Sequence, residues 1–503
     1  MKGIMVLGTS SDVGKSLIAT AICRAFANNG FKVAPFKSQN MSNNSYVTVD
    51  GMEIGRAQGI QAEAAKTTAT VWMNPILLKP RSDQHSEIVL CGKAIDTLTG
   101  RGYRESFYET GLTTIRNSLN KLAEDYEVLV SEGAGSPVEI NLKERELVNM
   151  KVAEMADLPV ILVADIDRGG VFASIIGTLE LFTAEERARV KGLLINKFRG
   201  DPSLFEDGVK WLEDKTGIPV LGVLPYIENH MIDSEDSLSL PAFSSKKKSL
   251  LDIAVIKPPY ISNYSDIEPF YYEPDAAIRW VSQLSEIGKP DAVILPGTKS
   301  TIRDLQHFKL SGIADWLIDF AKSGGHIIGI CGGYQMLGRL LIDQEGTDTG
   351  SLSTNETGLG LIPANTYFQK EKNTVRASGF LHPMTSIKNE NMIEGFEIHY
   401  GNTIVENEQH FLLLNNGQPE GYFANDGKII GTYIHHIFHN DSWRAEWLNI
   451  LRKAKGIPLQ ETVHISQLKD KKYDELAAKL VEHVDWETLV DITINWSTDH
   501  ELA

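Results

Sequence analysis

The chain has 503 residues, with 49 lysines and arginines against 66 aspartates and glutamates, a net charge of −17. This acidic balance argues against a nucleic-acid or anionic-membrane partner, because both need a basic face. Three scattered cysteines are too few for a disulfide framework, and no stretch approaches the 18 uninterrupted apolar residues of a membrane span. We therefore expect a soluble cytoplasmic protein of two or three domains.

Short apolar runs recur along the first half of the chain. They are Ile4–Leu7, Val128–Val130, Pro159–Ala164, Leu193–Ile195 and Val220–Leu224. Near-continuous apolar runs are typical of strands that are covered on both faces. A helix is expected at 17–28, with Gly30 as its stop signal. Alternation of strands and helices predicts a parallel α/β sheet.

A change of composition between 234 and 249 separates the two halves, and we place an inter-domain linker at 236–250. A second series of strands is predicted at Ile253–Ile256, Ala292–Leu295, His326–Ile330 and Ile429–Tyr433. From Asp441 onward the spacing of apolar residues predicts helices. The expected fold is therefore α/β, with two doubly wound parallel-sheet domains and a helical tail. The expected ranges are 1–235, 251–440 and 441–503.

A candidate phosphate-binding loop lies between the first strand and the first helix. Its sequence is Gly8-Thr9-Ser10-Ser11-Asp12-Val13-Gly14-Lys15-Ser16. Backbone N–H groups and a helix N-terminus attract an anion in such a loop. Lys15 would contact the β and γ phosphates of ATP, and the Ser16 hydroxyl would bind Mg²⁺. The motif is a variant, because Thr9 stands where the strict pattern has glycine, and the alternative is a glycine-rich turn with an incidental lysine.

Three charged residues are candidates to complete this site. Asp50 and Glu132 could supply the oxygen ligands that Mg²⁺ prefers. Glu132 is the better candidate, because it follows a buried strand at its carboxyl end, where α/β sheets bind ligands. Lys37 also follows a strand and could neutralise charge on a phosphoryl group. Each of the three could instead be a solvated surface residue.

A second candidate site surrounds Cys331, which lies in a Gly-x-Cys-x-Gly turn between a buried strand and a helix. Such a turn exposes a nucleophile at the strand end, and the helix N-terminus stabilises its thiolate. A backbone N–H after the turn, such as that of Gly332, could bind an oxyanion. His435, at the end of another apolar strand, is the best candidate for the base. A buried core cysteine is the alternative.

Further polar residues could join this second site. Gly297 follows a strand and could present another oxyanion N–H, although it could also belong to a plain turn. His399 would lie with Glu397 on the face of a strand opposite Phe396, and a structural role is at least as plausible for it. A metal site at His435, His436 and His439 is the weaker alternative, because no cysteine or close glutamate completes it.

The variant loop with Lys37, Asp50 and Glu132 resembles dethiobiotin synthetase and its relatives, which activate a carboxylate with ATP. Partition-type ATPases carry a lysine where this chain has Thr9. The region around Cys331 resembles class I glutamine amidotransferases, many of which have a glutamate two residues after the histidine. Here that residue is Ile437, so either another group orients His435 or the site works as a Cys–His dyad.

Over nearly its whole length the chain resembles the cobyric acid synthase family. Besides the turn around Cys331 and His435, six segments carry this resemblance: Pro35–Met41, Glu53–Gln58, Met73–Pro80, Glu132–Pro137, Val163–Gly170 and Ile195–Gly200. The resemblance implies amidation of the b, d, e and g carboxylates of adenosylcobyrinic acid a,c-diamide, with ATP, Mg²⁺ and glutamine. It also implies an adenine contact at Asn196 and, more weakly, a substrate role for Glu146.

Two other functions stay open from the sequence. One is amidation of a different carboxylate, as in the sister family that makes cobyrinic acid a,c-diamide. The other is a nucleotide-gated scaffold with an inert amidotransferase domain, which Thr9 and the Cys331–His435 pair disfavour.

Overall fold

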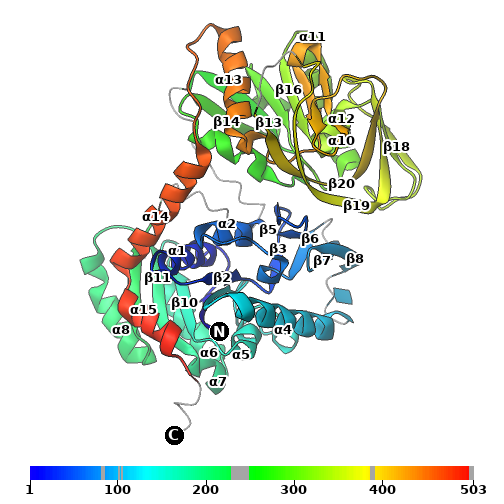
Figure 1. The fold of residues 1–503 in the computed structure, drawn as a ribbon. Helices are drawn as coiled ribbons and strands as arrows, with labels where there is room; N and C mark the ends of the chain where they lie inside the picture. The colour runs from blue at the N-terminus through cyan, green and yellow to red at the C-terminus, as the bar shows by residue number, and fades with distance from the viewer. Residues whose placement is uncertain (81–84, 100–101, 104–105, 228–248, 386–390, 498–503) are drawn as a thin grey trace. The chain divides into compact units, whose positions relative to one another are not determined.

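The computed structural model describes residues 1–80, 85–99, 102–103, 106–227, 249–385 and 391–497. The chain divides into two compact units (Figure 1). The first unit comprises Met1–Ser42, Met52–Pro241 and Gln467–Ala503, and the second comprises Asn43–Gly51 and Ala242–Ser466. The units are therefore not continuous in sequence, unlike the expected ranges. Most of the expected linker at 236–250 lies outside the described residues.

The first unit is built on a six-stranded parallel sheet with the order β12-β11-β10-β1-β9-β2. Its strands are β1 (Lys2–Gly8), β2 (Val33–Phe36), β9 (Val128–Glu132), β10 (Val160–Asp165), β11 (Val190–Phe198) and β12 (Val220–Pro225). The central strands are almost wholly buried, as their near-continuous apolar sequences predict. The predicted parallel α/β sheet is confirmed.

Helices and a smaller sheet complete this unit. Among the described residues, the α-helices before the tail are α1 (Lys15–Asn28), α2 (Arg56–Ala64), α4 (Tyr108–Asp125), α5 (Met150–Met155), α6 (Val171–Leu181), α7 (Ala184–Ala188) and α8 (Glu206–Thr216). The smaller sheet has the order β3-β6-β7-β8, with β3 (Gln39–Met41), β6 (Ile76–Pro80), β7 (His85–Leu90) and β8 (Lys93–Thr99). The short strand β5 (Glu53–Gly55) precedes α2.

The second unit contains another six-stranded sheet, of order β14-β13-β15-β16-β24-β23. Its strands are β13 (Leu251–Ile256), β14 (Ala276–Val281), β15 (Ala292–Leu295), β16 (His326–Ile330), β23 (Tyr422–Ala424) and β24 (Ile429–Thr432). All neighbouring pairs are parallel except β23 with β24. The predicted second parallel-sheet domain is confirmed.

Helices and a second sheet also accompany this domain. The sheet contains β17 (Leu340–Asp343), β18 (Thr354–Thr357), β19 (Ala364–Leu381), β20 (Ile393–Val405), β21 (Leu412–Leu414) and β22 (Pro419–Glu420). The helices are α9 (Leu284–Ile287), α10 (Thr301–Leu310), α11 (Ile313–Lys322), α12 (Gly332–Leu337) and the 3₁₀ helix η4 (Tyr264–Tyr272). The short strand β4 (Ser45–Val47) also belongs to this unit.

The helical tail is confirmed, but it is shared between the two units. Helix α13 (Asp441–Lys455) buries Trp443 and Trp447 in the core of the second unit. Helix α14 (Ile465–His483) and helix α15 (Trp486–Asn495) pack against α1 in the first unit (Figure 1). In the described part of the chain, no helix is long and apolar enough to cross a membrane.

Candidate functional site

The phosphate loop joins β1 to α1 with a strained turn at its end. Asp12 and Gly14 have positive φ angles of 59° and 102°. A Cβ atom at Gly14 would lie 2.2 Å from Nδ2 of Asn196, so glycine is needed there for both its backbone and its size. Helix α1 begins at Lys15, so the unpaired N–H groups of its first turn border the loop.

The first part of the loop is also closely packed. A Cβ atom at Gly8 would lie 2.4 Å from Cγ2 of Val13. The backbone N–H of Thr9 donates to the carbonyl of Val163 on β10, at 2.9 Å. The backbone of Thr9 therefore continues the pairing of β1 with β10, and the loop turns away from the sheet beyond it.

Lys15 and Ser16 begin α1 and are both buried. The Lys15 ammonium donates to the carbonyls of Ser10 and Gly135, at 3.1 and 3.2 Å. The Ser16 hydroxyl donates to Oε1 of Glu132 at 2.7 Å. A buried cation requires such partners, and these contacts hold Lys15 across the loop.

Glu132, at the carboxyl end of β9, is the centre of a buried polar cluster. Besides Ser16, its carboxylate accepts from Lys37 Nζ at 2.9 Å and from Gln61 Nε2 at 2.6 Å. The side chains of Lys37 and Glu132 are 1% and 0% exposed. The structure thus brings together three predicted residues, while Gln61, which no sequence motif identified, joins them from α2.

Asp50 is assigned to the second unit, whereas the cluster around Glu132 belongs to the first unit. It lies in the segment Asn43–Gly51, which belongs to the second unit, and its carboxylate accepts a hydrogen bond from Thr48. Its role as a Mg²⁺ ligand remains a prediction.

Asn196 and Lys197, on β11, support the phosphate loop from the opposite side. The Asn196 amide donates to the carbonyl of Val13 at 2.7 Å. The Lys197 ammonium donates to the carbonyl of Asp12 at 2.5 Å and to the carboxylate of Asp165 at 2.8 Å. The adenine contact of Asn196 remains a prediction, because the observed contact is with the loop itself. Lys197 was not among the predicted residues.

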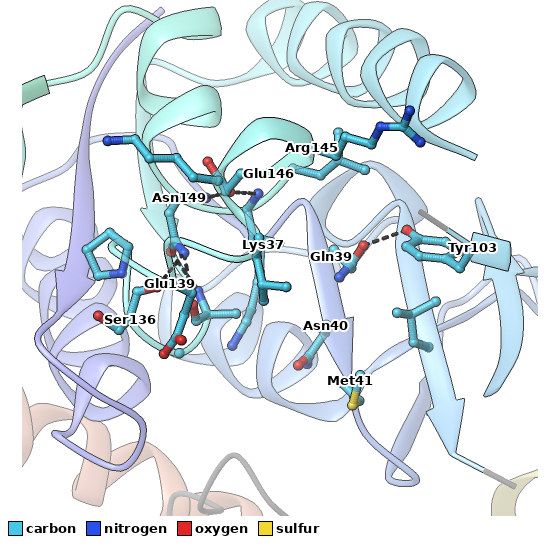
Figure 2. A pocket seen from close by; sticks show the side chains of 18 of the residues that line it. Lys37, Gln39, Asn40, Met41, Tyr103, Ser136, Glu139, Arg145, Glu146 and Asn149 are labelled. Carbon is cyan, nitrogen blue, oxygen red and sulfur yellow. Dashed lines mark hydrogen bonds between the residues drawn. The ribbon is translucent and has the colours of Figure 1, made fainter. Parts of the chain in front are cut away.

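A cavity of about 390 Å³ lies in the first unit beside the phosphate loop (Figure 2). Three of its lining residues connect it to that site: Ser11 belongs to the loop, Gly135 accepts from Lys15, and Lys37 binds Glu132. Glu146 also lines the cavity, but its carboxylate accepts N–H groups at the start of α5. Burial raises the pKa of Glu146 against these hydrogen bonds.

Cys331 lies between β16 and α12 with φ of 51° and ψ of −108°. Such a backbone is rare for a non-glycine residue and is typical of the sharp turn that carries a nucleophile, although the Cys331 side chain is buried here. A Cβ atom at Gly333 would lie 2.0 Å from the carbonyl oxygen of Leu295, and one at Gly332 would lie 2.6 Å from Cγ2 of Thr298. The glycines are therefore required by close packing against the end of β15 and the segment that follows it.

His435 is fixed by a carboxylate that the sequence analysis did not identify. Its Nδ1 lies 2.7 Å from Oδ2 of Asp266, and both side chains are 0% exposed. The other oxygen of Asp266 accepts the backbone N–H of His436 at 2.7 Å. Asp266 thus takes the orienting role for which Ile437 is unsuitable, and the site is a Cys–His–Asp triad in composition.

The charge on this imidazole is favoured by its neighbours. Burial opposes the imidazolium, but the Asp266 carboxylate and the Cys331 thiol raise the pKa of His435 to about 10. With Nδ1 directed to Asp266, Nε2 is the atom that can exchange a proton with the thiol. Nε2 also lies 3.1 Å from Nδ2 of Asn263, and the ring stacks on Phe396.

Two other predicted residues of the thiol site, Gly297 and His399, make different contacts. Gly297 lies against the ring, because a Cβ atom there would be 3.1 Å from Cε1 of His435. His399 shares a face of β20 with Glu397, as predicted, and its Nε2 lies 2.9 Å from that carboxylate. The His399 ring also stacks on Tyr433, with centroids 3.7 Å apart. Roles for Gly297 and Gly332 in oxyanion binding, and for His399 in glutamine binding, remain predictions.

The alternative of a metal at the three histidines finds no support in these contacts. His435 directs its ring nitrogens to Asp266 and Asn263, and Nε2 of His439 lies 3.0 Å from the carbonyl of Ser265. Within the described ranges, no group of three or more His, Cys, Asp or Glu residues is arranged to hold a metal ion.

The fold and the two sites define a nucleotide-binding domain joined to a thiol-dependent amidotransferase domain. Residues 4–239 match the CobQ/CobB/MinD/ParA nucleotide binding domain. Residues 252–443 match the CobB/CobQ-like glutamine amidotransferase domain. The chain is therefore a glutamine amidotransferase with a nucleotide-binding domain.

Comparison with similar proteins identifies the family of glutamine amidotransferases to which the chain belongs. The chain is 48% identical to the cobyric acid synthase of Geobacillus thermodenitrificans, over 96% of each chain. It is 49% identical to that of Anoxybacillus flavithermus, over 96% of this chain and 95% of the relative. It is 46% identical to that of Desulforamulus reducens, over 97% of each. The chain belongs to the cobyric acid synthase family, which confirms the resemblance seen in its motifs.

Proposed function

We propose that this enzyme transfers ammonia from glutamine to the b, d, e and g carboxylates of adenosylcobyrinic acid a,c-diamide, and consumes one ATP for each amide. The observation that carries this proposal is the presence of two complete sets of reactive groups in one chain. One is the phosphate loop with Ser16, Lys37 and Glu132. The other is Cys331 with His435 and Asp266.

In the amidotransferase domain, the Cys331 thiolate attacks the carboxamide carbon of glutamine. The His435 imidazolium then gives its Nε2 proton to the departing ammonia, and a thioester remains on the sulfur. Water, activated by the now neutral imidazole, hydrolyses the thioester to glutamate and regenerates the thiolate–imidazolium pair. Asp266 keeps Nδ1 protonated and directed away from the sulfur throughout. Gly297, Gly332 and His399 are the proposed contacts for the oxyanion and for glutamine.

In the nucleotide-binding domain, a carboxylate oxygen of the corrinoid attacks the γ phosphorus of ATP, and ADP leaves. The resulting acyl phosphate is attacked by ammonia, and inorganic phosphate departs from the carbonyl carbon. Phosphoryl transfer depends on positioning and charge neutralisation. Lys15 and the loop amides hold the phosphates in this proposal, Lys37 faces the transferred group, and Asn196 approaches the adenine.

The donor groups of this site suit Mg²⁺. Ser16 and Glu132 present a hydroxyl and a carboxylate oxygen 2.7 Å apart, and hard oxygen donors are what Mg²⁺ prefers. These two residues would hold the ion, with Asp50 as a further proposed ligand. When bound, the ion neutralises charge on the phosphates.

A reducing compartment suits this chemistry, because Cys331 must stay a free thiol, and all three cysteines are free in the structure. We therefore propose that the enzyme works in the cytoplasm with small-molecule substrates.

The test is mass spectrometry of the corrinoid after incubation with ATP and glutamine. Four successive conversions of carboxylate to amide, starting from the a,c-diamide, are expected. Conversion of cobyrinic acid only as far as the a,c-diamide would indicate the sister activity instead. Absence of ATP hydrolysis and of glutamate release with every acceptor would indicate a scaffold.

A further inference from the structure

We propose that the cavity beside the phosphate loop binds the carboxylate-bearing edge of the acceptor, a carboxylate carried on an amphipathic macrocycle. This proposal rests on the function proposed above. Ser11, Lys37 and Gly135 line the cavity and also belong to the phosphate site or contact it. A carboxylate in the cavity would therefore be held next to the phosphoryl group, which is the proximity that the transfer needs.

The arrangement of the sheet separates this cavity from the nucleotide base. The strand before the phosphate loop, β1, has β9 and then β2 on one side, and β10 and then β11 on the other. Apart from Ser11 of the phosphate loop, the lining residues follow β2 and β9 or come from the small sheet and the segments near it. Among the described residues, none comes from β10, β11 or β12. Asn196, the proposed adenine contact, lies on β11. The base and the acceptor would then approach the phosphates from opposite sides.

The lining fits an amphipathic acceptor better than a small polar one. Leu78, Ile88 and Tyr103 supply an apolar and aromatic wall, while Lys37 and Asn40 supply polar groups. Figure 2 shows Lys37 between Tyr103 and the side that carries Ser136 and Glu139. A volume of about 390 Å³ falls in the range of small-molecule sites.

The cations that line the cavity differ in what they contact. Lys143 is paired with Glu186 at 2.7 Å, and Figure 2 shows the guanidinium of Arg145 directed away from Lys37. Lys37 is thus the lining cation whose ammonium contacts the phosphate site through Glu132. We assign the carboxylate under attack to the Lys37 end of the cavity and the ring edge to the Tyr103 end.

Tyr103 is a suitable residue for testing this assignment, because it is held in place by two contacts. Its hydroxyl donates to Oε1 of Gln39 at 2.5 Å, and its ring stacks on Phe107 with centroids 4.8 Å apart. For Tyr103→Ala, equilibrium dialysis should show about tenfold weaker binding of the a,c-diamide, because one large apolar contact is lost. ATP binding and glutaminase activity should stay within about twofold. Trp211→Ala, at an exposed aromatic residue of α8, is the control.

Equal affinity of wild type and Tyr103→Ala for the a,c-diamide would overturn the site, and the proposed function would still stand if the wild type amidates. A second variant uses Met41, a lining residue that is 53% exposed, so that its replacement should not affect folding. A maleimide should label Met41→Cys, and the a,c-diamide should slow that labelling. An unchanged labelling rate at saturating a,c-diamide would also overturn the proposal.

A separate observation concerns Asn263, which links His435 to the segment Asn43–Gly51. The Asn263 amide nitrogen lies 3.1 Å from Nε2 of His435, and its Oδ1 accepts the backbone N–H of Ser45 at 3.0 Å. Oδ1 of Asn44 in turn accepts the backbone N–H of Tyr264 at 3.2 Å. All these residues belong to the second unit. We infer that Asn263 is a positioning residue through which this segment controls the glutaminase reaction.

The proposed control of the glutaminase reaction depends on Nε2 of His435, the imidazole nitrogen that exchanges a proton with the thiol. Because Asp266 holds Nδ1, Nε2 must carry the proton that is exchanged with the thiol, and the Asn263 amide directs N–H donors at Nε2 and so opposes a proton there. The segment directly follows β3 in the chain, and β3 lines the proposed acceptor cavity. A change at the cavity on acceptor binding can therefore reach Asn263 through a short covalent connection, so that ammonia is released when a carboxylate is present.

The test is glutamate release with and without ATP and the a,c-diamide. Wild type should be stimulated about fivefold or more. Asn263→Ala should raise the unstimulated rate and remove the stimulation, while Asn402→Ala, at an exposed asparagine of β20, should not. Ser45→Pro, which deletes the N–H donor, should act like Asn263→Ala, whereas Ser45→Ala keeps that donor and the stimulation. Unchanged stimulation in Asn263→Ala, or loss of both rates, would overturn the inference.

Discussion

The two reactive sites lie at the carboxyl ends of parallel strands, but they are assembled differently. The phosphate loop is one contiguous segment from Gly8 to Ser16, and residues such as Glu132, Lys37 and Gln61 join it from other segments. The thiol site combines Cys331, His435 and Asp266 from three separate segments, and the carboxylate lies 169 residues before the histidine. A contiguous motif can be identified from sequence, whereas a dispersed one requires the tertiary fold.

A buried carboxylate pairs with a cation in both sites, but its role differs between them. In the first, Glu132 neutralises Lys37 and anchors Ser16, so that paired charges organise the phosphate pocket. In the second, Asp266 raises the pKa of His435 and so favours the reactive imidazolium. Substitutions at the two sites should separate these roles, because each should impair either glutamine hydrolysis or ATP-dependent activation and leave the other reaction intact.

The largest effect is expected from removal of the nucleophile. Cys331→Ala should lower glutamine-dependent amidation by about 10⁴-fold or more, because no covalent route to ammonia remains. Amidation with free ammonia should stay near the wild-type rate. Assays of corrinoid products with each nitrogen source measure both. Glutamine-driven synthesis that survives in this variant would disprove the assignment of Cys331.

Removal of the phosphate-loop cation should produce the complementary pattern. Lys15→Ala should lower synthesis by about 10³-fold with either nitrogen source, because charge on the phosphates is no longer neutralised. Unstimulated glutaminase activity should be unchanged. Lys32→Ala, at an exposed lysine of the same unit, is the control. Near-normal synthesis in Lys15→Ala would mean that ATP binds elsewhere.

Asp266→Asn should affect only the thiol site. Glutaminase activity should fall by about 10²-fold, less than in a serine-dependent triad, because a thiolate needs less help from its base. Asp266 raises the pKa of His435, so its loss should lower that pKa. The imidazolium is then lost at lower pH, and the alkaline limb of the pH–rate profile should move down from about pH 10. A profile identical to wild type would exclude an orienting role for Asp266.

The smallest effect is expected at the support of the phosphate loop. Asn196→Ala removes the hydrogen bond to Val13, and we expect the KM for ATP to rise by about tenfold, as for one lost hydrogen bond to a rigid loop. The KM for glutamine should not change. Steady-state kinetics with each substrate varied in turn give both constants, and an unaltered KM for ATP would limit Asn196 to a structural role.

Much of the first site could be predicted, because its residues follow strands whose apolar runs are visible in the sequence. Glu132 ends one strand and Lys37 directly follows another strand of the same parallel sheet, and the expected proximity is observed. Gln61 could not be predicted, because its helix has no motif and reaches Glu132 only through packing. Asp266 lies in a 3₁₀ helix without a recognisable pattern. The residue Ile437 left open whether another group orients His435 or the site is a dyad, and the structure supplies the other group.

The amino-acid sequence by itself determined the two parallel sheets, the phosphate loop and the cysteine turn, because each depends on apolar runs and glycines close together in the chain. Tertiary structure alone decided which carboxylate orients His435, how the tail is divided between the units, and that residues 43–51 belong to the second unit. These outcomes depend on hydrogen bonds and packing between segments that are distant in sequence, for which local residue patterns carry no signal.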